Sequence, residues 1–173
     1  LRETGTAQEY RGRELLELLQ NADDAGGDGG GTCRAAIVLT ERGLCVANTG
    51  TVFSAAGVKS LMLTNNSPKR YQRARYIGNK GLGFRSILGW TTSPFVLSGN
   101  LELAFSRSFV EEWLKRLCSE SADVHRKVEM ERQHGVAHPA SLLALPVVGL
   151  SASDAHEDLF QKARSLRSEG YDT

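Results

Sequence analysis

The 173-residue chain is predicted to adopt an α+β fold, because segments with helical apolar spacing alternate along it with short paired runs of apolar or β-branched residues. A turn containing glycine joins the two runs of each pair, which is typical of antiparallel hairpins. Hydrophobic residues make up 40% of the chain, enough for one domain with a sizeable core. We therefore expect a single domain in which helices pack on antiparallel strands.

A first helix is expected over residues 9–25. Its apolar residues recur at spacings of three and four, which places them on one face: Leu15, Leu18, Leu19, Ala22 and Ala25. Gly26 is expected to end this helix, since glycine tolerates the left-handed conformation that follows many helices. The glycine-rich residues 26–31 are then expected to form a flexible loop.

Two hairpins and a short helix are expected next. The first hairpin pairs residues 35–40 with residues 44–47, and the second pairs residues 94–98 with residues 101–105. Between them, Ser54 is expected to cap a helix that runs to about residue 63.

The other segments complete the α+β pattern. Residues 64–76 are polar and basic with a central proline, which indicates a mobile loop. A glycine-rich turn is expected to enter a short helix at residues 84–88. Residues 108–133 are predicted to be helical, with a break near residues 119–122, and a last helix is expected over residues 154–167.

The formal net charge of +1 conceals an uneven distribution, because residues 42–101 hold eight Lys or Arg and no Asp or Glu. The summed field of such a stretch favours an anion, which leaves a nucleotide's phosphates, a nucleic acid and a lipid head group as candidates. A solvated basic surface is the simpler alternative. Composition alone does not choose among them.

Cysteine usage and hydropathy bear on the compartment. The three cysteines have no C-x-x-C spacing, so a reducing, cytoplasmic compartment is expected rather than a disulfide framework or a thiolate metal site. No apolar run approaches the roughly 18 residues that span a bilayer. The chain starts without methionine and stops at Thr173, so we expect a segment of a larger protein.

Polar residues on the first helix form a candidate metal and catalytic stripe. Glu17, Asn21 and Asp24 are spaced at i, i+4 and i+7, which places them within a narrow arc of the helix. An amide oxygen one turn from a carboxylate suits Mg²⁺, a cation that prefers oxygen ligands. A solvated helix face is the alternative interpretation.

A glycine-rich turn provides a candidate phosphate site. Gly78, Gly81 and Gly83 let the backbone approach an anion, Lys80 adds a positive charge, and the following helix presents free N–H groups. The turn lacks the ending of a P-loop and follows no strand directly, so neither a Walker site nor a dinucleotide fold is supported. A third segment, residues 46–50, is on its own an ordinary turn at a strand end.

In their order along the chain, ELLQNADDAG, VANTG and IGNKGLGFRS resemble the N, G1 and G2 boxes of the GHKL superfamily of Bergerat-fold ATPases. The third segment looks most like the ninety-kilodalton heat-shock chaperones and their sacsin-type and NO VEIN-type relatives. The resemblance implies a two-layer α/β sandwich with a mixed, mostly antiparallel sheet and helices on one face. It also implies that residues 1–173 are one ATP-binding domain with a lid at residues 64–76.

The resemblance assigns roles to residues of the first two boxes. Glu17 would be the general base that orients water toward the γ-phosphate, Asn21 would coordinate Mg²⁺, and Asp24 would lie near the nucleotide. Asn48 stands where the family usually has an aspartate that accepts a hydrogen bond from the adenine amine, and an asparagine oxygen can still accept it. Gly50 would give the base clearance.

The resemblance also assigns the phosphate-cradling turn and one late residue. Thr173 would lie near the nucleotide on a late strand. The turn would consist of Gly78, Asn79, Lys80, Gly81, Leu82, Gly83 and Phe84.

The function implied is slow, Mg²⁺-dependent ATP hydrolysis, with lid closure coupled to neighbouring domains in a chaperone-like or remodelling role. A non-hydrolysing, nucleotide-gated interaction module is the alternative, motivated by Asn48. A histidine kinase catalytic domain is disfavoured, since no helix carries a convincing phosphoacceptor histidine. The four histidines are expected at the surface: His125, His134, His138 and His156.

Expected partners are ATP and either further domains of the same chain or client proteins, with no membrane. Nucleic acid is not favoured: Arg70, Arg73 and Arg75 are equally well explained as lid charges that face phosphate.

Overall fold

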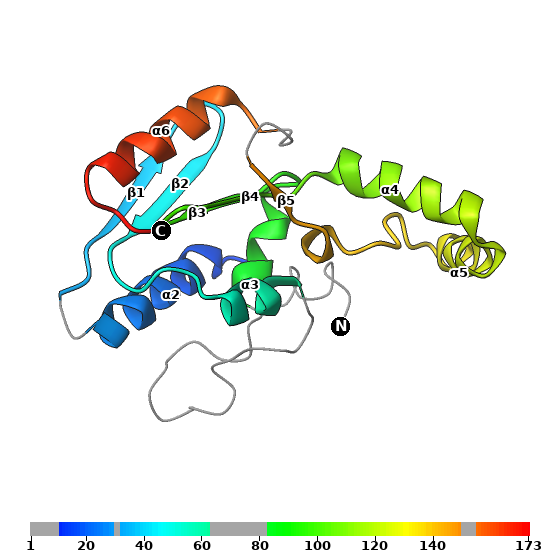
Figure 1. The fold of residues 1–173 in the computed structure, drawn as a ribbon, viewed down its shortest axis with the longest axis horizontal. Helices are drawn as coiled ribbons and strands as arrows, with labels where there is room; N and C mark the ends of the chain where they lie inside the picture. Colours follow the sequence, from blue (N-terminus) through cyan, green and yellow to red (C-terminus); the bar gives the residue numbers. More distant parts are fainter. Residues whose placement is uncertain (1–10, 30–31, 63–82, 150–154) are drawn as a thin grey trace.

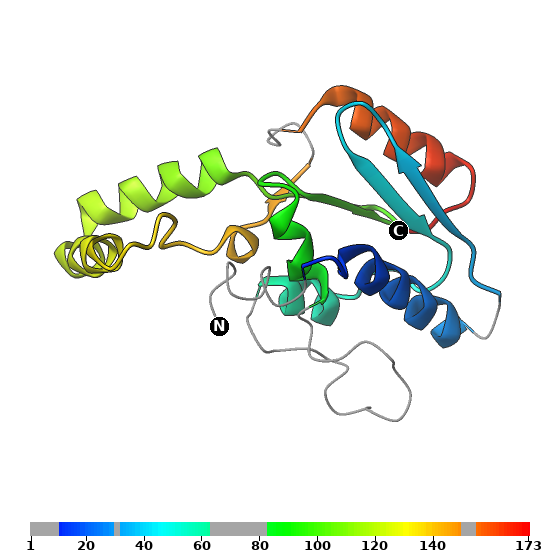
Figure 2. The same ribbon diagram turned by 180° about the vertical axis from the view of Figure 1, so that it is seen from behind.

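The computed structural model describes residues 11–29, 32–62, 83–149 and 155–173 (Figure 1). Within these ranges the strands form a two-stranded and a three-stranded antiparallel sheet, and helices precede, separate and follow them. The predicted α+β class is therefore confirmed. In both views, helix α6 (Glu157–Ser168) lies on one side of the two-stranded sheet and helix α2 (Glu14–Gly29) on the other (Figures 1 and 2).

Helix α2 differs from the predicted helix at both ends. Gly12 has φ +82°, so the chain enters α2 only after a left-handed residue, and the predicted start at residue 9 lies outside the described residues. The helix also continues through Gly26, which was expected to end it. A Cβ on Gly26 would lie 2.3 Å from the Cβ of Cys33, so glycine is required there for close packing and not for termination.

The first hairpin is confirmed and consists of β1 (Ala35–Leu39) and β2 (Leu44–Asn48). Its antiparallel register runs from Ala35 opposite Asn48 to Leu39 opposite Leu44. Alternation along β2 directs Cys45 and Ala47 into an apolar cluster with Leu159 and Leu166 of α6. The alternate residues of β2, Leu44, Val46 and Asn48, therefore face the opposite side of the sheet, toward α2.

The second sheet consists of β3 (Phe95–Ser98), β4 (Leu101–Ala104) and β5 (Val147–Val148), in that order. The β3–β4 hairpin was predicted, and its turn contains Gly99 at φ +55°. β5 pairs with β4 after the 3-10 helix η3 (Leu142–Ala144). One face of this sheet is covered by α6, where Phe95 and Phe160 meet edge to face with ring centroids 4.9 Å apart.

The main core lies beneath the three-stranded sheet. Helix α3 (Ala55–Met62) and the 3-10 helix η2 (Gly83–Gly89) both pack against it. η2 also contacts α2, which positions the N-terminal helix beside the core. The buried residues of this core are Leu61, Val96, Leu103, Phe105, Val110, Leu142 and Leu143.

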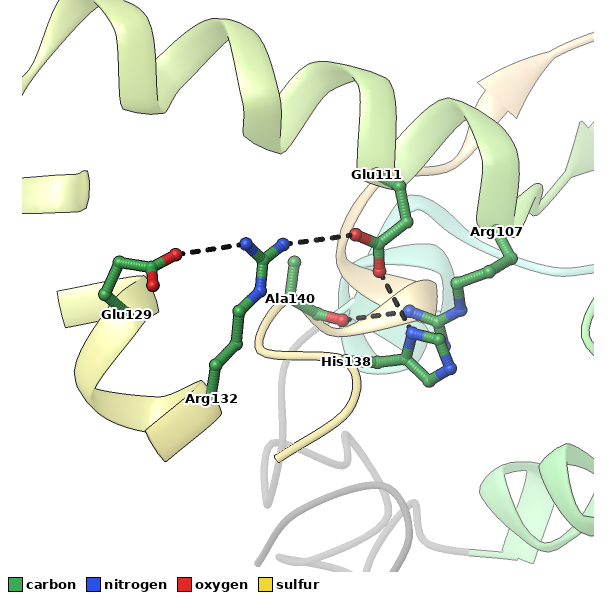
Figure 3. A network of polar contacts seen from close by, with 6 residues as sticks. All are labelled: Arg107, Glu111, Glu129, Arg132, His138 and Ala140. Atoms are coloured by element: carbon green, nitrogen blue, oxygen red, sulfur yellow. Dashed lines mark hydrogen bonds and ion pairs between the residues drawn. The ribbon is translucent and has the colours of Figure 1, made fainter. Parts of the chain in front are cut away.

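Helices α4 (Arg107–Glu120) and α5 (Ala122–Gln133) extend away from the sheets (Figures 1 and 2). The predicted break between them is confirmed at Ser121, which ends α4 and caps α5 by accepting a hydrogen bond from the Val124 N–H at 3.4 Å. Figure 3 shows how the pair is joined to the chain that follows it. Glu111 of α4 contacts Arg132 of α5 at 4.0 Å and His138 at 3.0 Å.

The residues that follow α6 connect the two sheets. Thr173 forms backbone hydrogen bonds with Asn48 of β2, and the carbonyl of Asp172 accepts one from the N–H of Gly99, in the β3–β4 turn, at 2.8 Å. Tyr171 packs into the cluster beneath α6, and the guanidinium of Arg34 lies over its ring, 5.1 Å from the centroid. Segment 171–173 therefore lies between β2 and β3.

Among the described residues, no helix combines the length and the apolar character that crossing a membrane requires.

Candidate functional site

A cavity of about 980 Å³ lies between α2 and the adjacent ends of β2 and β3, and it extends toward α6. Its apolar wall includes Phe53, Phe84, Ile87, Trp90 and Leu97. Several polar groups line it where α2 approaches the two strand ends. They include Glu17, Asn21, Asp24, Asn48, Thr51 and Thr173.

The polar stripe of α2 forms one wall of this cavity. Glu17 and Asp24 are only 7% and 6% exposed, and Asn21 is half-buried between them. A solvated helix face does not describe this stripe, since such carboxylates would be in water. Spacing at i, i+4 and i+7 directs all three side chains to the same side of the helix, as the sequence predicts.

Glu17 has a charged neighbour four residues earlier, immediately before α2. Its carboxylate Oε1 lies 3.5 Å from Nη2 of Arg13, whose side chain is largely exposed. Because the arginine is solvated, the ion pair contributes little to stability. It does place a positive charge beside the carboxylate proposed as a base.

Asn48, the last residue of β2, is aligned by its backbone. Its N–H donates to the Thr173 carbonyl at 2.7 Å, and its own carbonyl accepts from the Thr173 N–H at 3.1 Å. The same carbonyl also accepts from the Asp172 N–H at 2.9 Å, so residues 172 and 173 both lie opposite Asn48. The Asn48 side-chain Nδ2 donates to the Thr49 carbonyl at 3.2 Å, which leaves Oδ1 as the acceptor of that amide.

Gly50 is required for a close backbone approach. It has φ +127°, and a Cβ there would lie 2.6 Å from the carbonyl oxygen of Ala25 in α2. That same carbonyl accepts the Thr51 N–H at 3.0 Å, while the Gly50 N–H donates to the Asp172 carboxylate at 2.9 Å. Gly50 packs the loop against α2 and is not among the residues that line the cavity.

The turn to which the resemblance assigns phosphate binding is only partly described. Gly78, Asn79, Lys80, Gly81 and Leu82 lie outside the described residues, as does the predicted lid at residues 64–76. Gly83 begins η2, and Phe84, the next residue, lines the cavity.

Ser98 is a polar residue of the site region that sequence reasoning missed. It ends β3, is 3% exposed, and accepts a hydrogen bond from the Phe53 N–H at 2.8 Å. Its Oγ lies 2.6 Å from Oγ1 of Thr173. A serine in an apolar strand was a weak signal, because its significance depends on a residue far away in the sequence.

The histidines lie at the surface, as predicted. Nδ1 of His134 contacts the Met130 carbonyl, and His138 pairs with Glu111 (Figure 3). Nε2 of His156 lies 3.4 Å from Arg42 at the far end of the cavity. Within the described ranges, no three His, Cys, Asp or Glu residues are grouped so that they could hold a metal ion.

Comparison with known proteins gives one distant similarity to report. No family model matches the chain, and no solved structure matches it. Over 94 residues, which are 54% of this chain, the sequence is 30% identical to Protein NO VEIN of Arabidopsis thaliana. Those residues correspond to 3% of that relative, so the chain spans only a small part of its length.

Proposed function

We propose that this chain is an ATP-binding module of the GHKL type, related to the NO VEIN-type proteins. One observation carries the proposal: Glu17, Asn21 and Asp24 of α2 line the same cavity as Asn48 and Thr173. Five residues from three distant stretches of the chain thus converge on one space. The resemblance assigns Glu17 to the base, Asn21 to the metal and Asn48 to the adenine amine, and it implies that Asp24 and Thr173 lie near the nucleotide.

The cavity suits a nucleotide in size and chemistry. Its volume of about 980 Å³ is at the upper end of the range for small-molecule sites, and its lining is mostly apolar with a few grouped polar residues. An apolar wall with Phe53 and Phe84 suits a purine ring. The Asn48 Oδ1 can accept a hydrogen bond from an exocyclic amine.

The donor atoms on α2 fit Mg²⁺. Asn21 offers an amide oxygen, and Glu17 and Asp24 offer carboxylate oxygens on the same face. Asn21 is the residue that the resemblance assigns to the cation, and phosphate oxygens and water would supply the remaining ligands. When bound, Mg²⁺ would neutralise charge on the phosphates.

Within this proposal, Glu17 holds and orients water as the general base, and turnover is slow. The Arg13 guanidinium lies 3.5 Å from Glu17 Oε1 and competes for the carboxylate oxygens that would orient water. The same contact, together with Asn48 in place of the family's aspartate, favours a second candidate: a nucleotide-gated interaction module that binds ATP without hydrolysing it. In either form we propose a cytoplasmic protein whose partners are further domains of the same chain or client proteins.

Calorimetric titration tests the proposed function. The intact chain is titrated with ATP and with a non-hydrolysable analogue, each with and without Mg²⁺. We expect saturable binding of both nucleotides, tighter with Mg²⁺. An absence of binding heat for ATP under both conditions would show that the cavity is not a nucleotide site.

Phosphate release separates the two candidates. Glu17→Gln should retain ATP binding and lose turnover, whereas Glu112→Gln, on the exposed surface of α4, should change neither. Equal turnover in wild type and Glu17→Gln would refute the role of Glu17. Arg13→Ala should raise turnover if the chain is an ATPase, while ATP binding with no phosphate release in any variant would support the interaction module.

A further inference from the structure

We propose that the exposed face of α4 is a self-association surface, on which a second copy of this chain docks its own α4 in the antiparallel direction. The face consists of Phe109, Glu112, Trp113 and Arg116, which we call the α4 stripe. These four residues are not among those that line the cavity. The inference therefore goes beyond the proposed function and does not depend on it.

The α4 stripe presents two large aromatic side chains that the fold leaves partly exposed. Phe109 is 39% exposed and Trp113 is 37% exposed. Spacing at i, i+3, i+4 and i+7 places all four residues of the stripe on one side of the helix. The buried residues of α4, Val110 and Leu114, lie on another side. The helix thus packs on its own chain without using the stripe, whose aromatic rings are of the kind enriched in protein interfaces.

The two charged residues of the stripe have opposite signs. Glu112 and Arg116 are exposed, and no ion pair joins either side chain to another residue within the described ranges. The neighbouring Glu111, by contrast, contacts Arg132 and His138 (Figure 3). The charges of the stripe are therefore free to pair with those of another molecule.

The order of these charges identifies that molecule as an antiparallel second copy. Glu112 and Arg116 lie two residues on either side of Leu114, so a two-fold axis at the level of Leu114 places Glu112 of each copy opposite Arg116 of the other. In a parallel pair, like charges would face each other. The same axis places the two Trp113 residues about 3 Å apart along the helix direction. Charge complementarity then sets the orientation, and the aromatic side chains supply most of the affinity.

Sedimentation equilibrium of the intact chain at increasing concentration tests the proposal. A contact through one helix face is smaller than a standard interface, so we expect a dimer with a dissociation constant of about 10–100 µM. Glu112→Arg alone and Arg116→Glu alone should each weaken association at least about tenfold, because each variant places like charges opposite one another twice. Lys127→Glu, at an exposed residue of α5, changes the net charge as Arg116→Glu does and should leave association unchanged.

Mixing the two α4 charge variants tests the direction of docking. One copy then presents two cations in its stripe and the other presents two anions, so the equimolar mixture should associate nearly as tightly as the wild type. Such rescue is expected of an isologous antiparallel contact, and it also shows that both variants are folded. Trp113→Ala should weaken self-association at least about tenfold without any change of charge.

Three results would overturn the inference. The first is a wild type that stays monomeric up to about 1 mM. The second is self-association of Glu112→Arg and Arg116→Glu that equals that of the wild type. The third is a mixture of these two variants that stays monomeric although the wild type dimerises, since the copies would then meet through another surface or in another direction.

Discussion

Asn48 and Thr173 exchange two backbone hydrogen bonds, of 2.7 and 3.1 Å, which join the end of β2 to the segment that follows α6. The pair is extended on its other side by the contact between Thr173 and Ser98 at the end of β3. Thr173 thus contacts the end of β2 in one sheet and the end of β3 in the other. The polar end of the cavity is built on this connection.

Gly50→Ala should destabilise the fold and loosen the loop that follows Asn48. An alanine at φ +127° is strained, and its Cβ would press on the Ala25 carbonyl. We expect the free energy of unfolding, measured by urea denaturation, to fall by about 1–3 kcal/mol.

Gly27→Ala provides the matched control for Gly50→Ala. Gly27 lies within α2, and a Cβ there would meet nothing within 4 Å. Alanine should therefore raise the free energy of unfolding by about 0.5–1 kcal/mol. Similar effects at the two glycines would contradict the specific role given to Gly50.

Leu143→Ala tests the core beneath the three-stranded sheet. Leu143 is 0% exposed and packs in the main apolar cluster, so truncation leaves a cavity. The expected loss is about 2–5 kcal/mol of unfolding free energy in thermal or urea denaturation. Val148→Ala on β5, where the side chain is 80% exposed, should change stability by less than about 0.5 kcal/mol.

Cys45 should make the fold sensitive to alkaline pH. Burial raises the pKa of its thiol, the carboxylate of Asp158 raises it further, and Lys162 opposes them. Since the pKa is higher in the folded state, the contribution to stability is fully present below the ordinary thiol pKa of about 8.5 and is lost as pH rises through the folded-state value.

The measurement is the free energy of unfolding at a series of pH values from neutral to alkaline. Cys45→Ala should be less stable at neutral pH but decline less steeply than the wild type as the pH rises. Cys118→Ala, at a half-buried residue of α4, should follow the wild-type slope. Identical slopes for wild type and Cys45→Ala would show that this thiol does not contribute to the alkaline decline.

Glu111→Ala tests the polar network that joins α4, α5 and the chain after α5 (Figure 3). Glu111 contacts His138 and Arg132, and Arg132 also reaches Glu129 at 3.2 Å. Such partly exposed pairs are weak, so we expect a loss below about 1 kcal/mol that shrinks in high salt. The control is Glu112→Ala at the exposed neighbour, and a salt-independent difference between the two variants would argue against an electrostatic origin.

Elements specified by local patterns could be predicted from the sequence. The hairpins could be predicted from paired apolar runs with glycine at or beside their turns. The break between α4 and α5 could be predicted from the serine-containing residues between them, and Ser121 caps α5 there. The end of α2 could not be predicted in this way. Gly26 has the residue type of a helix stop, but its contact with Cys33, which lies beyond the end of α2, determines its role.

In the candidate site, too, features set by local spacing could be predicted, whereas features set by distant contacts could not. Helical spacing was enough to predict that Glu17, Asn21 and Asp24 share a face, and the structure adds that this face lines a cavity. The roles of these residues stay predictions. Ser98 was beyond sequence reasoning, because a serine in a strand acquires significance only through the 2.6 Å approach of Thr173.

The position of segment 171–173 directly after α6 has a thermodynamic consequence. A ligand that orders Thr173 also restrains α6, which is further fixed to the β3–β4 hairpin by Arg167 through Gly99 and Glu102. Such a coupling is reciprocal. If a protein bound to α6 changes the affinity of the cavity for its ligand by some factor, then filling the cavity changes the affinity of α6 for that protein by the same factor.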